Sequence, residues 1–119
     1  MKIVLLAPAL LLTAIALSSQ QQTPTQRFPQ FENDAVRVWK SVVAPNTPLT
    51  MHRHDHGRVI IALSGGTMKI VTQGGPTETH QWDTGKAYWL PANPPNQVHA
   101  DVNAGDKPIE VMVVELKQN

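Results

Sequence analysis

Three histidines lie within five consecutive residues, at His52, His54 and His56, and a further one, His99, follows much later in the chain. Imidazole is the commonest protein ligand of transition metals, because its ring nitrogen carries an available lone pair near neutral pH. Side chains alternate along a β-strand, so His52 and His54 would share one face of an extended segment. Two rings on that face and a third ring from a distant strand predict a pocket that can hold a metal ion.

The segments that must position these rings are short and are separated by clusters of Gly, Pro, Asn and Asp. After residue 17, no window has a sustained apolar period of 3.6 residues, which argues against helices. Many short strands at even spacing, with turn residues between them, predict an all-β sandwich or barrel. The expected strands cover residues 36–43, 49–54, 58–63, 67–72, 78–82, 86–90, 97–102 and 109–116.

The N-terminal end differs in composition from the rest of the chain. Met1 and Lys2 precede an uncharged, almost wholly apolar run over residues 3–17, and Ala16-Leu17-Ser18 at its end is typical of a small-residue cleavage site. These are the three parts of a secretory signal peptide. A permanent membrane anchor would need about 20 apolar residues, which this run does not reach. We therefore expect residues 1–18 to be removed and the protein to be periplasmic or secreted.

The remaining chain is first polar and then strand-forming. Residues 19–30 are rich in Gln, Thr and Pro without periodicity, which predicts a flexible linker. Residues 31–117 are expected to form one β-barrel domain, which depends on its hydrophobic core because the chain has no cysteine for disulfides. Without Lys2, nine basic and nine acidic residues remain, and no basic block occurs. This composition argues against nucleic acid as a partner, and no membrane contact is expected after cleavage.

Other residues accompany the histidines at fixed spacing. The residues that share this pattern are His52, His54, Gly65, Gly85, Pro91, His99 and Asn103. The pattern resembles the two motifs of the cupin superfamily, G-x5-H-x-H-x3,4-E-x6-G and G-x5-P-x-G-x2-H-x3-N, and is closest to small single-domain bacterial cupins of the cupin-2 type. The resemblance covers nearly all of residues 36–116. It implies a double-stranded β-helix, or jelly-roll barrel, with the histidines pointing inward.

The chain departs from these motifs at four places. Arg58 occupies the position of the motif Glu, which the resemblance implies as a fourth metal ligand. A guanidinium stays protonated and cannot bind a metal. Asn46 and Asn93 stand where Gly is usual, and Asn tolerates the left-handed conformation better than most residues. The segment from Pro91 to His99 is longer than the motif by three residues, which reshapes the rim of the pocket.

Several interpretations of the metal site stay open. In the first, His52, His54 and His99 bind a divalent metal and leave its remaining positions open to water or a ligand. In the second, His56 is a fourth ligand rather than a hydrated turn residue. In another, the pocket is free of metal and its histidines only hydrogen-bond a ligand. Three imidazoles suit Fe, Mn, Ni, Cu, Co or Zn, so the ligand types do not choose among these metals.

The residues expected to contact a substrate are Arg58 and Tyr88. Arg58 can point into the barrel and bind a carboxylate or phosphate through paired hydrogen bonds, or turn outward and pair with Asp55. Tyr88 shares its strand face with Leu90 and is expected to line the pocket. Asp101 follows His99 at same-face spacing and can orient an imidazole or be an ordinary exposed residue.

These residues predict an exported cupin-domain protein whose metal pocket binds a small anionic organic molecule. If the protein is an enzyme, the resemblance implies a dioxygenase, isomerase or lyase that turns this molecule over. The alternative is a non-catalytic periplasmic ligand-binding or sensor barrel, with or without metal. A homodimer is implied by the resemblance alone.

Overall fold

Eight β-strands make up the regular structure of residues 24–118, the part of the chain that the computed structural model describes. In chain order they are β1 (Gln26–Glu32), β2 (Val36–Val43), β3 (Arg58–Ser64), β4 (Gly66–Thr72), β5 (Thr77–Trp82), β6 (Ala87–Leu90), β7 (His99–Asn103) and β8 (Ile109–Leu116). Within this range, no helix is long and apolar enough to cross a membrane. The signal peptide predicted for residues 1–18 lies outside the described residues.

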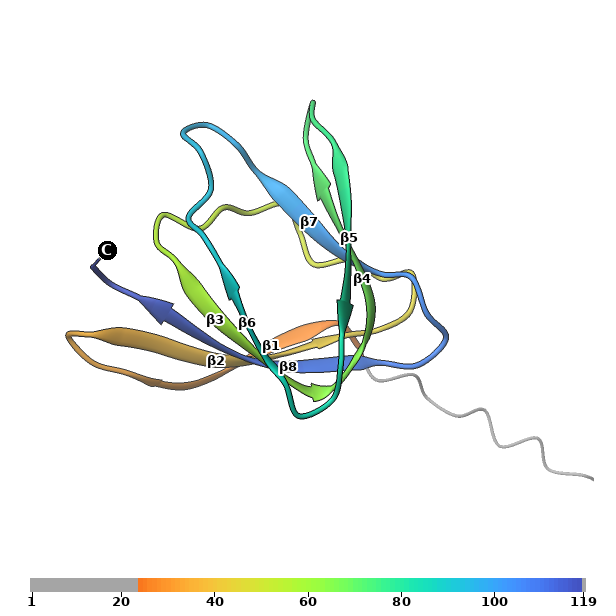
Figure 1. The fold of residues 1–119 in the computed structure, drawn as a ribbon, viewed down its shortest axis with the longest axis horizontal. Helices are drawn as coiled ribbons and strands as arrows, with labels where there is room; N and C mark the ends of the chain where they lie inside the picture. Colours follow the sequence, from red (N-terminus) through yellow and green to blue (C-terminus); the bar gives the residue numbers. More distant parts are fainter. Residues whose placement is uncertain (1–23, 119) are drawn as a thin grey trace, which may run out of the picture.

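The strands form two antiparallel sheets, which enclose the interior between them (Figure 1). The larger sheet has the order β1-β2-β8-β3-β6, and the smaller has the order β5-β4-β7. The chain passes from β3 in one sheet to β4 in the other at Gly65. A Cβ atom at Gly65 would lie 2.0 Å from the carbonyl oxygen of Trp82, so only glycine fits this corner. The predicted all-β jelly-roll barrel is confirmed.

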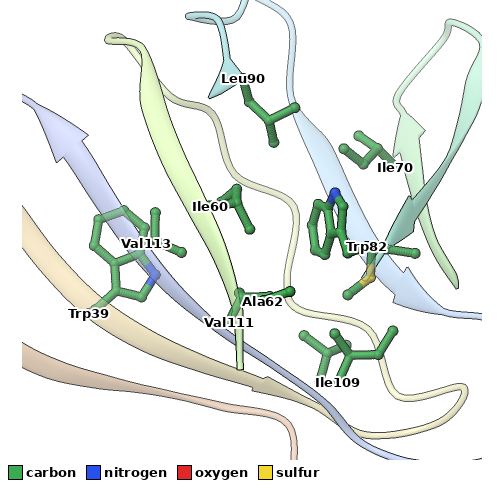
Figure 2. Close-up of a cluster of buried hydrophobic side chains, with 11 residues drawn as sticks. Trp39, Ile60, Ala62, Ile70, Trp82, Leu90, Ile109, Val111 and Val113 are labelled. Atoms are coloured by element: carbon green, nitrogen blue, oxygen red, sulfur yellow. The ribbon is translucent and has the colours of Figure 1, made fainter. Parts of the chain in front are cut away.

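The core lies between the two sheets, where alternate side chains of each strand point inward. Ile60 of β3 and Val113 of β8 face Trp82 of the smaller sheet, and Trp39 of β2 closes one side (Figure 2). Met68 of β4 belongs to the same cluster. These five side chains are between 1% and 7% exposed. Full burial of an apolar side chain of this size contributes about 2 kcal/mol, so the core supports the fold without disulfides.

The predicted linker does not extend to residue 30. From Gln26 the chain belongs to β1, which pairs with β2 from Gln26 opposite Val42 to Glu32 opposite Arg37. β1 is an edge strand whose side chains are mostly exposed. Such a strand has no apolar alternation, so its sequence does not differ from that of a linker.

The strand predicted over residues 49–54 is absent. The Leu49 amide donates to the Asp101 carbonyl at 3.2 Å, and His52 and His99 exchange backbone hydrogen bonds of 2.9 and 2.8 Å. Between these two contacts the first segment advances by three residues, from Leu49 to His52, while its partner advances by only two, from Asp101 to His99. This shift in register breaks the ladder and leaves an isolated bridge. The other predicted strands are present, with ends shifted by two residues at most.

Candidate metal site

The rings of His52, His54 and His99 meet inside the barrel although the first two do not lie on a strand. One ring nitrogen from each comes within 4.8 Å of the others. The ring centroids are 5.0 Å apart for His52 and His54, 4.5 Å for His52 and His99, and 5.5 Å for His54 and His99. The convergence predicted from the histidine spacing is therefore present.

His52 is fixed by its backbone bridge to His99 and by a contact of its own ring. Its Nδ1 lies 2.7 Å from the Thr50 carbonyl oxygen. A carbonyl oxygen only accepts, so Nδ1 must carry the hydrogen and donate. The lone pair is then on Nε2, which is buried and has no hydrogen-bond partner among the described residues. Asp101 Oδ2 lies 3.6 Å from this nitrogen, too far for a hydrogen bond, so its lone pair can bind a metal.

His54 is positioned through both its backbone and its ring. Its amide donates to Asn93 Oδ1 at 2.7 Å, and the Asn93 amide donates to the His54 carbonyl at 2.8 Å. The ring lies parallel to Trp39, and its Nδ1 is 2.5 Å from Glu115 Oε2. A hydrogen on Nδ1 donates to this carboxylate and leaves the Nε2 lone pair for a metal.

Asn93 does not replace a motif glycine in the way that the sequence predicts. Asn46 has a positive φ of 52°, as its left-handed role requires. In the 91–98 loop, the positive φ of 61° belongs to Asn96 instead. Asn93 contributes its side chain, which holds the His54 backbone.

His99 is the most deeply buried of the three, with 1% of its surface exposed. Neither of its ring nitrogens has a hydrogen-bond partner within residues 24–118, and Asp101 Oδ1 lies 3.8 Å from Nε2. An unpaired polar group in a protein interior costs about 1–3 kcal/mol. Burial lowers the pKa of His99 from 6.5 to about 4, so the ring is neutral at pH 7 and one of its two nitrogens carries an available lone pair. Three imidazoles that each turn one ring nitrogen toward a common point fit a divalent transition metal.

Solved structures of similar shape settle the fold. No protein-family model matches the chain, and no curated protein is significantly similar to it in sequence. A cupin domain from Bordetella pertussis superposes with a TM-score of 0.69 at 22% identity, over 83% of this chain and 99% of that one. The chain has the cupin fold.

Two further cupin-like structures show how far this fold varies. A double-stranded β-helix protein from Klebsiella pneumoniae has a TM-score of 0.61 at 20% identity, over 85% of this chain and 84% of that one. The DMSP lyase DddQ from Ruegeria pomeroyi has a TM-score of 0.57 at 15% identity, over 80% of this chain. This chain spans about half of that lyase, 48% of its length.

Arg58, which stands at the position of the cupin motif Glu, lies inside the barrel. It is 4% exposed and borders an interior cavity with His54 and Asp101. Its guanidinium donates to the Pro91 carbonyl at 3.2 Å. Burial lowers the pKa of Arg58, and the charges of Asp101 and Glu115 partly offset this effect. The outward pair with Asp55 does not form, because Asp55 pairs with Arg53 at 3.0 Å.

Glu115 was not identified from the sequence, yet it is the carboxylate in contact with His54. It pairs in register with Arg58 across β8 and β3, so a negative charge lies on the strand beside the substituted position. Burial raises the pKa of Glu115, but the hydrogen bond from His54 and the charges of His54 and Arg58 outweigh it and lower the pKa overall. The available signal was a single acidic residue at an inward position of an apolar strand.

His56 and Tyr88 do not join the site. His56 is outside the three-histidine cluster and borders a separate surface cleft with Arg53 and Lys117. Tyr88 packs against the core, and its hydroxyl oxygen accepts a hydrogen bond from the Asp83 amide at 2.8 Å. Tyr88 does lie on the inward face of β6. Its hydroxyl is bound by the turn after β5, however, and Tyr88 does not line the cavity beside Arg58.

Replacing Glu115 with Gln is expected to lower metal affinity about 10- to 100-fold, because a neutral amide holds the His54 proton and ring orientation less firmly. Competition titration with Co²⁺ or Zn²⁺ measures the effect. Glu110→Gln is the matched control, since Glu110 lies on the same strand at an outward position. Equal affinities for the two variants would contradict a role of Glu115 at the site.

The metal-free domain is expected to lose stability as the pH falls from about 6.5 toward 4. The pKa of His99 is about 4 in the folded state and near 6.5 in the unfolded chain, so the unfolded chain binds more protons in this window. At pH 5 this linkage lowers the free energy of unfolding by about 2 kcal/mol relative to pH 7. Urea unfolding in the presence of a chelator checks it. A His99→Leu variant with the same pH dependence would contradict the assignment to His99.

Proposed function

We propose that this cupin-fold domain binds one divalent transition metal through His52, His54 and His99 and, at that metal, a small anionic organic molecule. The observation that carries the proposal is the buried cluster of three ring nitrogens within 4.8 Å, of which those of His99 have no other partner among the described residues. Three protein ligands leave coordination positions open for a ligand. Arg58 supplies a buried positive charge beside this face, which favours an anion.

Each residue around the site has a separate task in this proposal. Thr50 and Glu115 hold the Nδ1 protons of His52 and His54, so that the Nε2 atoms face the site. Arg58 orients the anionic group of the ligand. The apolar core on the inner side excludes water. When bound, the metal would supply Lewis acidity or oxygen activation, the chemistry that dioxygenase, isomerase and lyase reactions require.

The second candidate is a non-catalytic periplasmic ligand-binding or sensor domain. The observation that favours it is Arg58, which puts a cation where the cupin motif has a carboxylate ligand. A set of three imidazoles with a nearby guanidinium holds a metal less firmly than a set that includes a carboxylate. In this form the histidines and Arg58 bind an anion by hydrogen bonds, with or without metal.

Metal analysis of the purified mature protein tests the first proposal. After metal loading and removal of excess metal, we expect roughly one metal ion per chain, with a loss to less than about a tenth in His54→Ala. A loaded protein with less than about a tenth of an equivalent would exclude the metal form and favour the sensor form. With metal bound, a substrate screen separates turnover from binding alone.

We also propose that the protein is exported and forms a homodimer. Export rests on the composition of residues 1–18, and dimerisation rests on the resemblance to cupins alone. Mass spectrometry of the N-terminus after expression in a bacterial host tests the removal of residues 1–18. Light scattering of the mature protein measures its mass in solution, and a monomer would exclude the dimer.

A further inference from the structure

A cleft at the mouth of the barrel is large enough for an organic ligand, whereas the interior is not. The cavity beside His54 and Arg58 has a volume of about 20 Å³, which holds a single water. The cleft has a volume of about 230 Å³ and opens beneath the loop of residues 91–98. The cleft is thus more than ten times as large as the interior cavity and has room for a small organic ligand.

One of the three histidines of the metal site, His99, lines this cleft. Arg58 also lines the cleft. Among the described residues that line it, Arg58 alone has a permanent positive charge. The Arg58 guanidinium therefore borders both the interior cavity and the cleft. A ligand in the cleft would place its anionic group beside this guanidinium.

The lining of this cleft also includes a carboxylate, that of Glu78 on β5. Glu78 pairs in register with the buried Ile70 of β4, and residues 78, 80 and 82 share the strand face that carries the buried Trp82. The Glu78 side chain therefore lies on the barrel side of β5, where it is 64% exposed, and His80 Nε2 lies 3.2 Å from its carboxylate. The β4–β5 hairpin and the 91–98 loop lie at the same end of the barrel in Figure 1.

We propose that the cleft binds a short carboxylate that also carries a hydroxyl or ammonium group. Its carboxylate lies at Arg58 and the metal, and its hydrogen-bond donor contacts Glu78. This inference rests on the proposed function, because it takes the metal site as the anionic end of the cleft. A carboxylate side chain is acceptor-only when ionised, so Glu78 selects ligands with a donor and disfavours a second anionic group.

Three probes of equal chain length test this selection on the Zn²⁺-loaded mature protein. Butyrate, 3-hydroxybutyrate and 3-aminobutyrate are titrated into the ¹⁵N-labelled protein, and chemical shifts in the 91–98 loop and β5 give the affinities. We expect the two donor-bearing probes to bind about tenfold more tightly than butyrate, since a hydrogen bond to a charged group is worth this much. In Glu78→Gln the preference should fall to about twofold or less. Asp106→Asn, in the exposed β7–β8 turn, should retain it.

Each result decides between the two proposals. Equal affinity of the three probes, or a preference that Glu78→Gln leaves intact, would overturn the selection by Glu78 and leave metal-dependent anion binding standing. A failure of every probe to bind the Zn²⁺-loaded protein would overturn both. A preference that disappears in Glu78→Gln but persists in Asp106→Asn supports the assignment of the cleft.

Discussion

His99→Leu is expected to abolish metal binding and, at the same time, to stabilise the metal-free domain. Loss of one of three ligands removes roughly a third of the binding free energy, which is a decrease in affinity on the order of a thousandfold. The buried imidazole has no hydrogen-bond partner among the described residues, so an apolar side chain of similar size removes an unpaired polar group from the interior. We expect a gain of about 1–2 kcal/mol in the free energy of unfolding without metal.

Two measurements on one variant check this prediction. Isothermal titration with Zn²⁺ gives the affinity, and urea unfolding in the presence of a chelator gives the stability. His56→Leu is the matched control, because His56 belongs to the same histidine-rich segment but lies outside the cluster. If His56→Leu loses the metal as well, His56 is a fourth ligand. If His99→Leu destabilises the metal-free domain, the ring nitrogens of His99 have partners that the structure does not describe.

Arg58→Met is expected to change metal affinity and anion affinity in opposite directions. Its cation repels a nearby metal ion and is compensated by Asp101 and Glu115. Without that cation, the two carboxylates attract the metal more strongly, and we expect metal affinity to rise about tenfold. Binding of butyrate to the metal-loaded protein should fall about 100-fold, because the paired hydrogen bonds and the charge are both lost.

The two affinities are measured by competition titration for the metal and by chemical-shift titration for butyrate. Arg53→Met serves as the control, since Arg53 pairs with Asp55 away from the three-histidine cluster. Arg58→Lys, which retains the charge but not the planar fork, should keep the metal affinity and lose part of the butyrate affinity. A fall in both affinities in Arg58→Met would show that Arg58 supports the site structurally instead.

The sequence predicted which residues meet but not how they are held. His52, His54 and His99 were identified because imidazoles at these spacings match a known two-motif pattern. The same-face argument failed, since residues 49–54 are not a strand and His54 is held by Asn93 and Glu115. The shift in register between residues 49–52 and 99–101 depends on how two segments pair in the folded protein. It therefore leaves no periodic signal in the sequence of either segment.

Two other residues show the same limit. Glu115 acts at the site because β8 lies beside β3 in the register that pairs it with Arg58, which its own segment does not specify. Tyr88 was expected to line the pocket from its strand face, but its hydroxyl is taken by the Asp83 amide in a neighbouring turn. Side-chain alternation predicts the direction of a residue and not the partner of its polar end.

The origin of the three rings has a mechanical consequence. His99 belongs to the smaller sheet, whereas His54 is anchored by Glu115 to the larger one. An ion shared by these rings would cross-link the two halves of the barrel, a constraint that many small domains obtain from disulfides and that this cysteine-free chain cannot make in that way. The melting temperature should then climb with metal concentration, and chelation should loosen the contact between the sheets.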